Sequence, residues 1–167
     1  MEIIISQASP ADAYEILELL KKAGGESDNL SFGAEGLPYT QEEEAAYISR
    51  IQASYDELML VARIDGKVVG IASLLHSAPL IQKRGNFSVT VLKDYWNIGI
   101  GSKLTSEIIN FARLHHFEAI DLEVRSDNLR AIGLYEKFKF ERVDGFPAFM
   151  NKRVKDIPLI HMSLLLI

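Results

Sequence analysis

The pattern of apolar and polar positions predicts strands and helices that alternate along the chain. Strands are expected where apolar residues alternate with polar ones or cluster over a few positions, and helices where apolar residues recur every three or four positions. The predicted strands cover residues 2–6, 58–64, 67–75, 86–92, 119–124, 140–143 and 159–167, and the predicted helices begin near Ser9, Thr40, Gly101 and Asn128. An order that mixes consecutive strands with helical crossovers indicates a three-layer α/β fold.

Local signals mark where several of these elements begin and end. Ser9-Pro10 suits the start of a helix, which Gly24-Gly25 is predicted to stop. Thr40 and Glu43 form a capping box for the next helix, and the Glu42–Glu44 run is expected to be a solvated helix start, where the helix dipole favours negative charge. Asp65-Gly66 predicts a type I′ turn and therefore a hairpin. A loop is predicted around Pro79 and an irregular segment around Pro147, and Asn128 is expected to cap the helix that follows it.

Residues 89–105 combine a strand, a glycine turn and the start of a helix. Apolar and polar side chains alternate over residues 87–91, Gly99 and Gly101 then interrupt the pattern, and apolar residues recur at four-residue spacing from Ile100 onward. The first turn of a helix has N–H groups without partners and the positive end of the helix dipole, so it favours an anion. By pattern alone, the glycines fit a phosphate site and a plain turn equally well.

Two familiar phosphate motifs are excluded at this turn. A P-loop requires Lys directly after its second glycine, whereas Ser102 follows Gly101. A dinucleotide fingerprint requires a third glycine at the position that Leu104 occupies.

Composition and charge narrow the class of protein. The 167 residues fit one domain, residues 1–167, and a hydrophobic content of 48% is ordinary for a globular protein. A net charge of −5 without a basic block argues against nucleic-acid binding. The N-terminus does not resemble a signal peptide and no apolar run approaches a membrane span, so no membrane partner and a cytoplasmic location are expected.

No metal site is expected from the residue types present. The absence of cysteine excludes disulfides, thiolate ligands and a cysteine nucleophile. The four histidines, His76, His115, His116 and His161, do not have the spacing of metal ligands.

The glycine turn resembles the acyl-CoA pyrophosphate loop of the GCN5-related N-acetyltransferase (GNAT) family. That loop is written as Arg or Gln, two residues, Gly, one residue, and Gly or Ala; here the run is Trp96-Asn97-Ile98-Gly99-Ile100-Gly101, with Trp96 in place of Arg or Gln. The segment Asn128–Phe140 resembles a second family marker, which contains Asn, Ala, Leu-Tyr and a Gly-Phe pair, although Lys139 stands where the glycine is common. With the element order, the resemblance covers nearly the whole chain.

The resemblance implies a three-layer α/β/α fold whose mixed, mostly antiparallel sheet is splayed at the central strand. It also implies transfer of an acetyl group from acetyl-CoA to a primary amine of a small molecule, a protein N-terminus or a lysine. The strand would contact the pantetheine arm of acetyl-CoA, and the glycine loop would hold its pyrophosphate. The donor-binding residues expected on this basis are Val89, Thr90, Val91, Asn97, Ile98, Gly99, Ile100, Gly101, Ser102, Asn128 and Tyr135.

The same resemblance makes Tyr135 the expected general acid. A tyrosine with its usual pKa of about 10 keeps its proton at pH 7 and can give it to a departing thiolate; without the family marker, Tyr135 reads as an aromatic residue on a buried helix face. The base that takes the amine proton stays open, and Glu26, Asp28, Glu35 and Glu123 are the candidates. Acceptor specificity is expected from residues 24–40 and 144–157.

Two other functions and one question of assembly stay open. A non-catalytic acyl-CoA sensor would keep the glycine loop but would not need Tyr135, and a generic nucleotide-binding domain would prefer ATP to CoA. The basic positions Lys152, Arg153 and Lys155 are expected to form an exposed loop, and the alternative is that they contact an acidic acceptor or the phosphates of CoA. The apolar last strand, residues 159–167, could be a sheet edge, which either a homodimer or an intramolecular neighbour would cover.

Overall fold

The structure, a computed structural model, describes residues 1–77, 83–144 and 152–166. The strands are β1 Ile4–Gln7, β2 Leu58–Ile64, β3 Lys67–His76, β4 Arg84–Val91, β5 Ala119–Arg125, β6 Glu141–Arg142, β7 Arg153–Val154 and β8 Ile157–Leu165, and the helices are α1 Ala13–Glu26, α2 Gln41–Ala53, α3 Ile100–Leu114 and α4 Leu129–Lys137. The described strands form one sheet in the order β1-β2-β3-β4-β5-β8-β6, and β7 also pairs with β8. Among the described pairs only β4 and β5 run parallel, so the sheet is mixed and mostly antiparallel.

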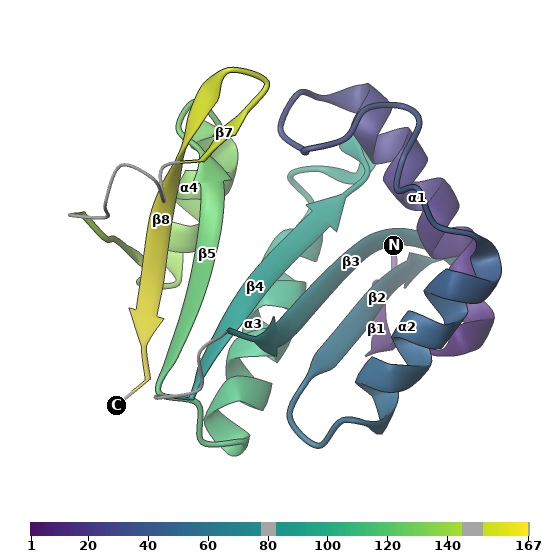
Figure 1. Cartoon of the computed structure of the whole chain (residues 1–167), viewed down its shortest axis with the longest axis horizontal. Coiled ribbons are helices and arrows are strands. Elements are labelled where there is room, and N and C mark those ends of the chain that lie inside the picture. Colours follow the sequence, from purple (N-terminus) through teal and green to yellow (C-terminus); the bar gives the residue numbers. More distant parts are fainter. Residues whose placement is uncertain (78–82, 145–151, 167) are drawn as a thin grey trace.

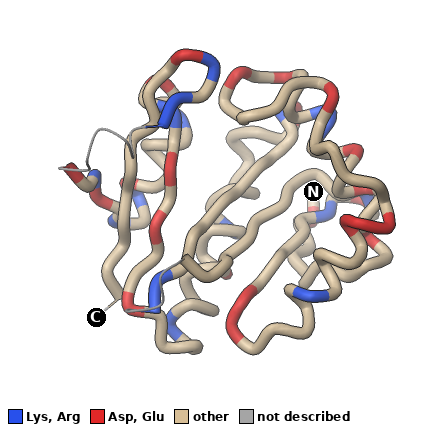
Figure 2. The backbone as a smooth tube through the Cα atoms, viewed as in Figure 1, with Lys and Arg blue, Asp and Glu red and all other residues tan. Residues whose placement is uncertain are grey.

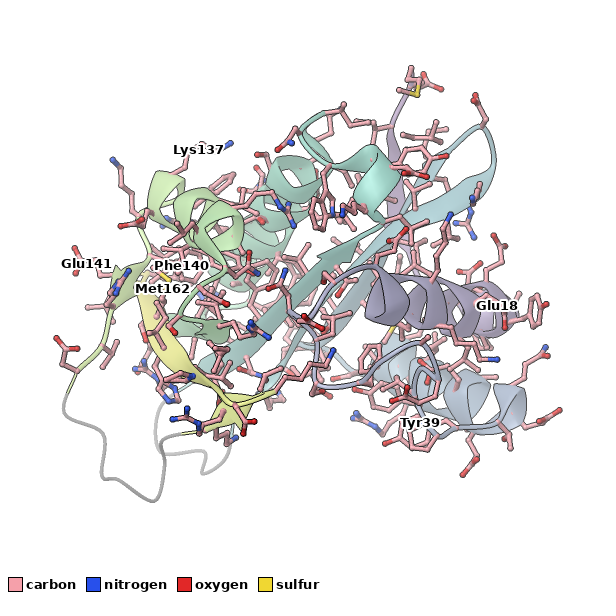
Figure 3. The ribbon with its side chains drawn as sticks, turned by 90° about the horizontal axis from the view of Figure 1, so that it is seen from above. Glu18, Tyr39, Lys137, Phe140, Glu141 and Met162 are labelled. Atoms are coloured by element: carbon pink, nitrogen blue, oxygen red, sulfur yellow. The ribbon has the colours of Figure 1, made fainter. Side chains whose placement is uncertain are left out.

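Helices cover both faces of the sheet, which confirms the three-layer prediction. Helices α1 and α2 pack on one face, where Ile16, Ile48 and Val61 are fully buried. Helices α3 and α4 pack on the other face around Leu104 and Ile120. Seen from above, α1 and α2 lie on the opposite side of the sheet from α3 and α4 (Figure 3).

The sheet opens between β4 and β5, as predicted. The two strands pair only through Arg84, Gly85 and Asn86, whereas β3 pairs with β4 as far as Val91. Strands β4 and β5 diverge upward in Figure 1 from the end at which these three residues pair. Arg84 holds the closed end, because its guanidinium makes hydrogen bonds of 2.8 and 2.6 Å to the two carboxylate oxygens of Asp121 on β5.

The prediction that Gly24-Gly25 stops the first helix is wrong, because α1 continues to Glu26. Neither glycine has the positive φ of a helix-ending glycine. Gly24 is buried instead, and a Cβ there would overlap the carbonyl oxygen of Gly33. The glycine therefore lets the segment after α1 pack directly on the helix.

The capping box and the hairpin are confirmed. Thr40 Oγ1 accepts from the Glu43 N–H at 3.1 Å, and the Glu43 carboxylate accepts from the Thr40 N–H at 2.9 Å. The turn residues Asp65 and Gly66 both have positive φ, 51° and 78°, as a type I′ turn requires.

The expectation of a fully solvated acidic start to α2 is wrong for Glu44, which is only 3% exposed. Glu44 lies four and seven residues before Ile48 and Ile51, so it shares their buried stripe. Burial raises the pKa of Glu44. Glu44 is therefore buried by its position on the apolar face of α2, although a carboxylate is more stable in water.

The C-terminal part contains a hairpin that the sequence pattern missed. Strands β7 and β8 are joined by Lys155 and Asp156, which both have positive φ, 50° and 67°, without the glycine that usually reveals such a turn. Strand β8 therefore begins at Ile157 and not at Leu159. Its outer edge pairs with β6 and β7, so neighbours in the same chain cover part of the edge for which a dimer was considered.

A few predictions lie outside the described residues. These are the loop around Pro79, the irregular segment around Pro147 with residues 145–151 of the expected acceptor region, and the last position of the C-terminal strand, residue 167.

Candidate active site

A cavity of about 900 Å³ lies where β4 and β5 diverge. One wall is residues 87–91 of β4, which have no partner on β5, and the other is formed by residues 123–125 of β5 and by α4. The segment after α1 and strand β7 close one end, and the glycine turn before α3 closes another. The splay of the sheet therefore creates the site, because none of the described strands fills the space between its two halves.

The glycine turn is shaped by two different constraints on its glycines. Gly99 caps α3 with φ at 96°, a conformation that residues with a Cβ rarely adopt. At Gly101 a Cβ would come within 3.2 Å of Leu134 Cδ2 on α4, so the glycine permits close packing of the two helices. The first helical hydrogen bond runs from Lys103 N–H to Gly99 C=O, which leaves the earlier N–H groups of the turn for a ligand.

The structure brings almost all of the predicted donor-binding residues together. Those that line the cavity are Val89, Thr90, Val91, Asn97, Gly99, Ile100, Gly101, Ser102, Asn128 and Tyr135. Ile98 is the exception among them, because its side chain is 41% exposed and lies outside the cavity lining. Asn128 also caps α4, since its Oδ1 accepts from the Ala131 N–H at 3.3 Å.

The lysine at the second departure from the family pattern keeps the backbone geometry of glycine. Lys139 has φ at 74°, in the left-handed region where glycine is favoured. It follows α4 and precedes Phe140, which is buried. Lysine therefore has, at this position, a backbone conformation that glycine adopts more easily.

Tyr135 lies on the inner face of α4 at the cavity wall. It is 6% exposed, and its ring makes edge contacts with Phe87 and Phe140 at centroid distances of 6.0 and 5.9 Å. Burial raises the pKa of Tyr135 to about 12. The phenol is therefore neutral throughout the ordinary pH range, and no side chain of the described residues hydrogen-bonds to it.

The four candidate bases have different surroundings. Glu26 lines the cavity but accepts the Lys93 N–H at 3.0 Å, and Glu35 is held outside it by the Gly33 N–H at 2.9 Å, a hydrogen bond that lowers the pKa of Glu35. Asp28 is outside the cavity lining, 3.5 Å from Lys155. Glu123 lines the cavity from β5, and its one ion-pair partner in the described chain, Lys152, is 3.4 Å away.

Arg125 is a residue of the site that sequence reasoning missed. It is buried at the end of β5, donates to both carboxylate oxygens of Asp127, and donates from Nη1 to the carbonyl oxygen of Asp28 at 2.7 Å. The hydrogen bond to Asp127 raises the pKa of Arg125, and the hydrogen bond from Arg125 lowers the pKa of Asp127. No local pattern signals a contact between segments so far apart in the chain.

The basic positions near the C-terminus are paired with other groups. Lys152 and Arg153 line the cavity, and Lys152 lies near Glu123. Lys155 approaches the Asp28 carboxylate, and Arg153 donates to the carbonyl oxygen of Asp156. Figure 2 shows basic and acidic positions on the loop between β7 and β8 and acidic positions on the segment after α1 that faces it. These residues are therefore more than the exposed basic loop that the sequence indicated.

No group of three or more His, Cys, Asp and Glu side chains in the described ranges is placed to hold a metal ion. Within the same ranges, none of the helices combines the length and the apolar character needed to cross a membrane.

Comparison with known sequences identifies the family of this fold and site. A sequence model of the Acetyltransferase (GNAT) family matches residues 21–140, and the chain belongs to this family. It is 36% identical over 94 residues to the probable N-acetyltransferase camello of Xenopus tropicalis, covering 55% of this chain and 43% of that protein. It is 34% identical over 99 residues to an N-alpha-acetyltransferase of Sulfurisphaera tokodaii, covering 53% and 59%. The chain thus spans about half the length of these curated relatives.

Solved structures show the same fold. An acetyltransferase of the GNAT family from Streptococcus pneumoniae superposes with a TM-score of 0.89 and 28% identity, covering 98% of this chain and 99% of that one. A putative acetyltransferase from Salmonella typhimurium, solved with its cofactor acetyl-CoA, superposes with a TM-score of 0.82 and 23% identity, covering 99% and 94%. The predicted fold class and family are therefore confirmed.

Proposed function

We propose that residues 1–167 form a single N-acetyltransferase domain that transfers an acetyl group from acetyl-CoA to a primary amine. The observation that carries the proposal is the meeting of three features in one cavity: the start of α3, the unpaired part of β4, and Tyr135. Membership of the GNAT family and relatives named as N-acetyltransferases support it. Acetyl-CoA in the Salmonella typhimurium neighbour supports the same donor.

The donor would bind along the opening between the strands. Amide groups at the start of α3 suit the pyrophosphate, because their N–H groups have no helical partner and the helix dipole favours an anion. Residues 87–91 of β4 have backbone groups without a β5 partner, which suits the amide-containing pantetheine arm. Asn128 lies on the far wall, and its side-chain oxygen caps α4. Its NH₂ group donates to none of the described residues and is therefore available to the same arm.

The reaction joins the amine nitrogen to the carbonyl carbon of the thioester and breaks the carbon–sulfur bond. Glu123 takes the amine proton directly or through water. Of the two candidate acids that line the cavity, Glu26 accepts a backbone N–H group, whereas the described partner of Glu123 is the Lys152 side chain. The sulfur leaves with the bonding electron pair and receives a proton from solvent. The products are the acetylated amine and free CoA thiol.

The surroundings of Tyr135 favour a hydrogen-bonding role over complete proton transfer. Its pKa of about 12 lies well above that of a thiol, about 8.5, so a full transfer to free thiolate would be unfavourable by roughly 5 kcal/mol. A neutral phenol can still donate a hydrogen bond to the sulfur as negative charge develops on it. We infer that Tyr135 stabilises the departing thiolate in this way.

The acceptor proposed first is the α-amine of a peptide. Relatives named N-alpha-acetyltransferase support that choice. Small-molecule amines and lysine side chains form the second set to test, because the residues at the acceptor end of the cavity, which include Ser27, Leu30 and Phe32, do not by their chemistry name one ligand. A cytoplasmic location and a homodimer stay predictions.

The proposal is tested by binding and turnover on the same protein. Calorimetry is expected to show acetyl-CoA binding, and a thiol-release assay is expected to show turnover with peptides or amines. The Tyr135→Phe variant should bind acetyl-CoA within about twofold of wild type and lose about 100-fold in kcat, the usual cost of one hydrogen-bond donor to developing charge. Tyr55→Phe, at a residue that is 77% exposed and outside the cavity, is the matched control.

The other outcomes separate the alternatives. Binding of acetyl-CoA without thiol release on any amine would favour the acyl-CoA sensor. Preference for ATP over CoA in a competition experiment would favour a nucleotide-binding domain. Full activity in Tyr135→Phe would remove Tyr135 from the mechanism and leave the rest of the proposal standing.

A further inference from the structure

The glycine loop lacks the polar residue that usually begins it. Trp96 occupies that position, and its indole has a single donor, the Nε1–H group. This group donates to the carbonyl oxygen of Val91 at 2.8 Å. Trp96 is thus held by the end of β4 and has no donor left for a phosphate.

A cation from another element lies against Trp96. The Cζ atom of Arg130, in the first turn of α4, is 3.6 Å from the centroid of the Trp96 ring. At this distance the guanidinium is attracted to the ring face, and a planar guanidinium can also stack on it. The ring and its surroundings remove part of the water around the guanidinium, and this desolvation lowers the pKa of Arg130.

Arg130 has no anionic partner in the described part of the chain. Arg50, Arg63, Arg84 and Arg125 each form an ion pair with a carboxylate. Arg130 forms neither an ion pair nor a side-chain hydrogen bond with any described residue, yet it lines the cavity. Its five N–H groups are therefore available to a ligand.

Helix α4 places Arg130 beside the start of α3. Arg130, Leu134 and Lys137 are four and three residues apart, so they lie on one face of α4. Leu134 packs against Gly101, where a Cβ would be 3.2 Å from Leu134 Cδ2. Lys137 Nζ donates to Ser102 Oγ in the first turn of α3 at 2.6 Å. Two cations from one helix face thus flank the N–H groups at the start of α3.

We propose that Arg130, held on the face of Trp96, binds a phosphate group of the CoA donor and supplies the charge that the first position of the glycine loop does not. The inference rests on the proposed function. A guanidinium offers two parallel N–H groups to a phosphate, and its stacking on Trp96 orients it before the ligand arrives. The pyrophosphate and the 3′-phosphate of CoA share this chemistry.

The test compares CoA binding by wild type, Arg130→Gln and a matched control, using calorimetry. Arg130→Gln removes the charge and is expected to weaken CoA binding about tenfold, since a hydrogen bond to a charged group contributes about that much. Arg113→Gln removes an exposed charge at the far end of α3, outside the cavity, and should not change the affinity. Arg130→Lys keeps the charge without the planar fork and should lie between Arg130→Gln and wild type.

A second ligand identifies the phosphate. Dephospho-CoA lacks the 3′-phosphate, so a loss in Arg130→Gln that is the same for both ligands places Arg130 on the pyrophosphate. A loss with CoA alone places it on the 3′-phosphate. Thermal unfolding of each variant shows that the fold is intact.

Two results would overturn the inference, and they are distinguishable. Arg130→Gln that binds both ligands within twofold of wild type would refute the role of Arg130 and leave the proposed function in place. Wild-type protein that binds neither ligand would overturn the proposed function and this inference with it.

Discussion

Arg125 donates a hydrogen bond from Nη1 to the carbonyl oxygen of Asp28 at 2.7 Å, joining two segments that are 97 residues apart in sequence. Its other nitrogens bind Asp127, so the guanidinium is held firmly at the end of β5. Asp28 belongs to the segment after α1, whose residues 29–32 line the cavity. The contact therefore ties the segment that closes the acceptor end of the cavity to the β5 wall.

Loss of this contact should affect the acceptor more than the donor. In Arg125→Gln we expect the KM for the amine to rise about fivefold, because roughly 1 kcal/mol of hydrogen bonding no longer holds the acceptor segment. The dissociation constant for acetyl-CoA should not change, since the glycine turn is at another end of the cavity. Arg142→Gln, at an exposed position on β6 outside the cavity, is the control. A change in donor affinity with an unchanged KM for the amine would contradict this prediction.

Gly24 and Gly25 offer a matched pair of substitutions in one helix. Gly24→Ala should destabilise the protein by about 1–3 kcal/mol, because the new methyl group would overlap the Gly33 carbonyl oxygen. Gly25→Ala meets only the Ala34 methyl at 3.2 Å and gains helix propensity, so its effect should be small. Urea unfolding gives the two stabilities. Equal effects of the two substitutions would show that the packing of Gly33 on α1 is not the cause.

The raised pKa of Tyr135 predicts a loss of stability at alkaline pH. The folded protein holds this proton up to a pKa of about 12, whereas an unfolded tyrosine loses it near 10. The stabilisation is therefore complete below about pH 10 and is lost as the pH rises toward 12, with roughly 1.4 kcal/mol gone at pH 11. Tyr135→Phe has no such proton, so urea unfolding at pH 9 and pH 11 should show a smaller loss in the variant.

The other titrating groups are the same in both proteins and cancel in that comparison. Losses of equal size in wild type and Tyr135→Phe would mean that Tyr135 titrates normally in the folded protein.

Glu123 should reveal its role through the pH dependence of catalysis. Without a base, only amine that has already lost its proton can react, so Glu123→Gln should lower kcat/KM about 100-fold near pH 7. The deficit should shrink as the pH rises and the fraction of free amine grows. Thiol-release rates from pH 6 to pH 9 give the profile, and Glu141→Gln, on exposed β6, is the control. A deficit that stays constant across this range would assign Glu123 to binding and not to proton transfer.

Some parts of the site could be read from the sequence because they depend on local chemistry. The glycine turn was found from the change between strand and helix periods, and Gly99 has the backbone angle that only glycine adopts easily. Asn128 was predicted to cap α4 from its place before an apolar helical pattern, and it does so. Tyr135 was selected from the family marker, and it lines the cavity.

Other parts depended on contacts between distant segments. The carboxylates of Glu26, Asp28, Glu35 and Glu123 looked equivalent in sequence. Packing leaves Asp28 and Glu35 outside the cavity and binds Glu26 to a backbone N–H group, which separates Glu123 from the other three. No sequence pattern indicated that Arg130 would stack on Trp96 or that Arg125 would bind the carbonyl oxygen of Asp28. Gly24 was predicted to end α1, because the sequence alone does not distinguish a glycine that ends a helix from one that lets a neighbouring backbone pack closely.

The order of the elements, their caps and the glycine turn follow from residues a few positions apart, since backbone dihedral preferences and side-chain periods act over that range. The splay of β4 from β5, the cavity that it opens and the groups that meet there arise in the folded chain. They depend on where Arg84 and Asp121 close one end of the strand pair and on which helices pack on each face. Burial and long-range hydrogen bonds then set the chemistry of side chains such as Tyr135, whose pKa no local pattern indicates.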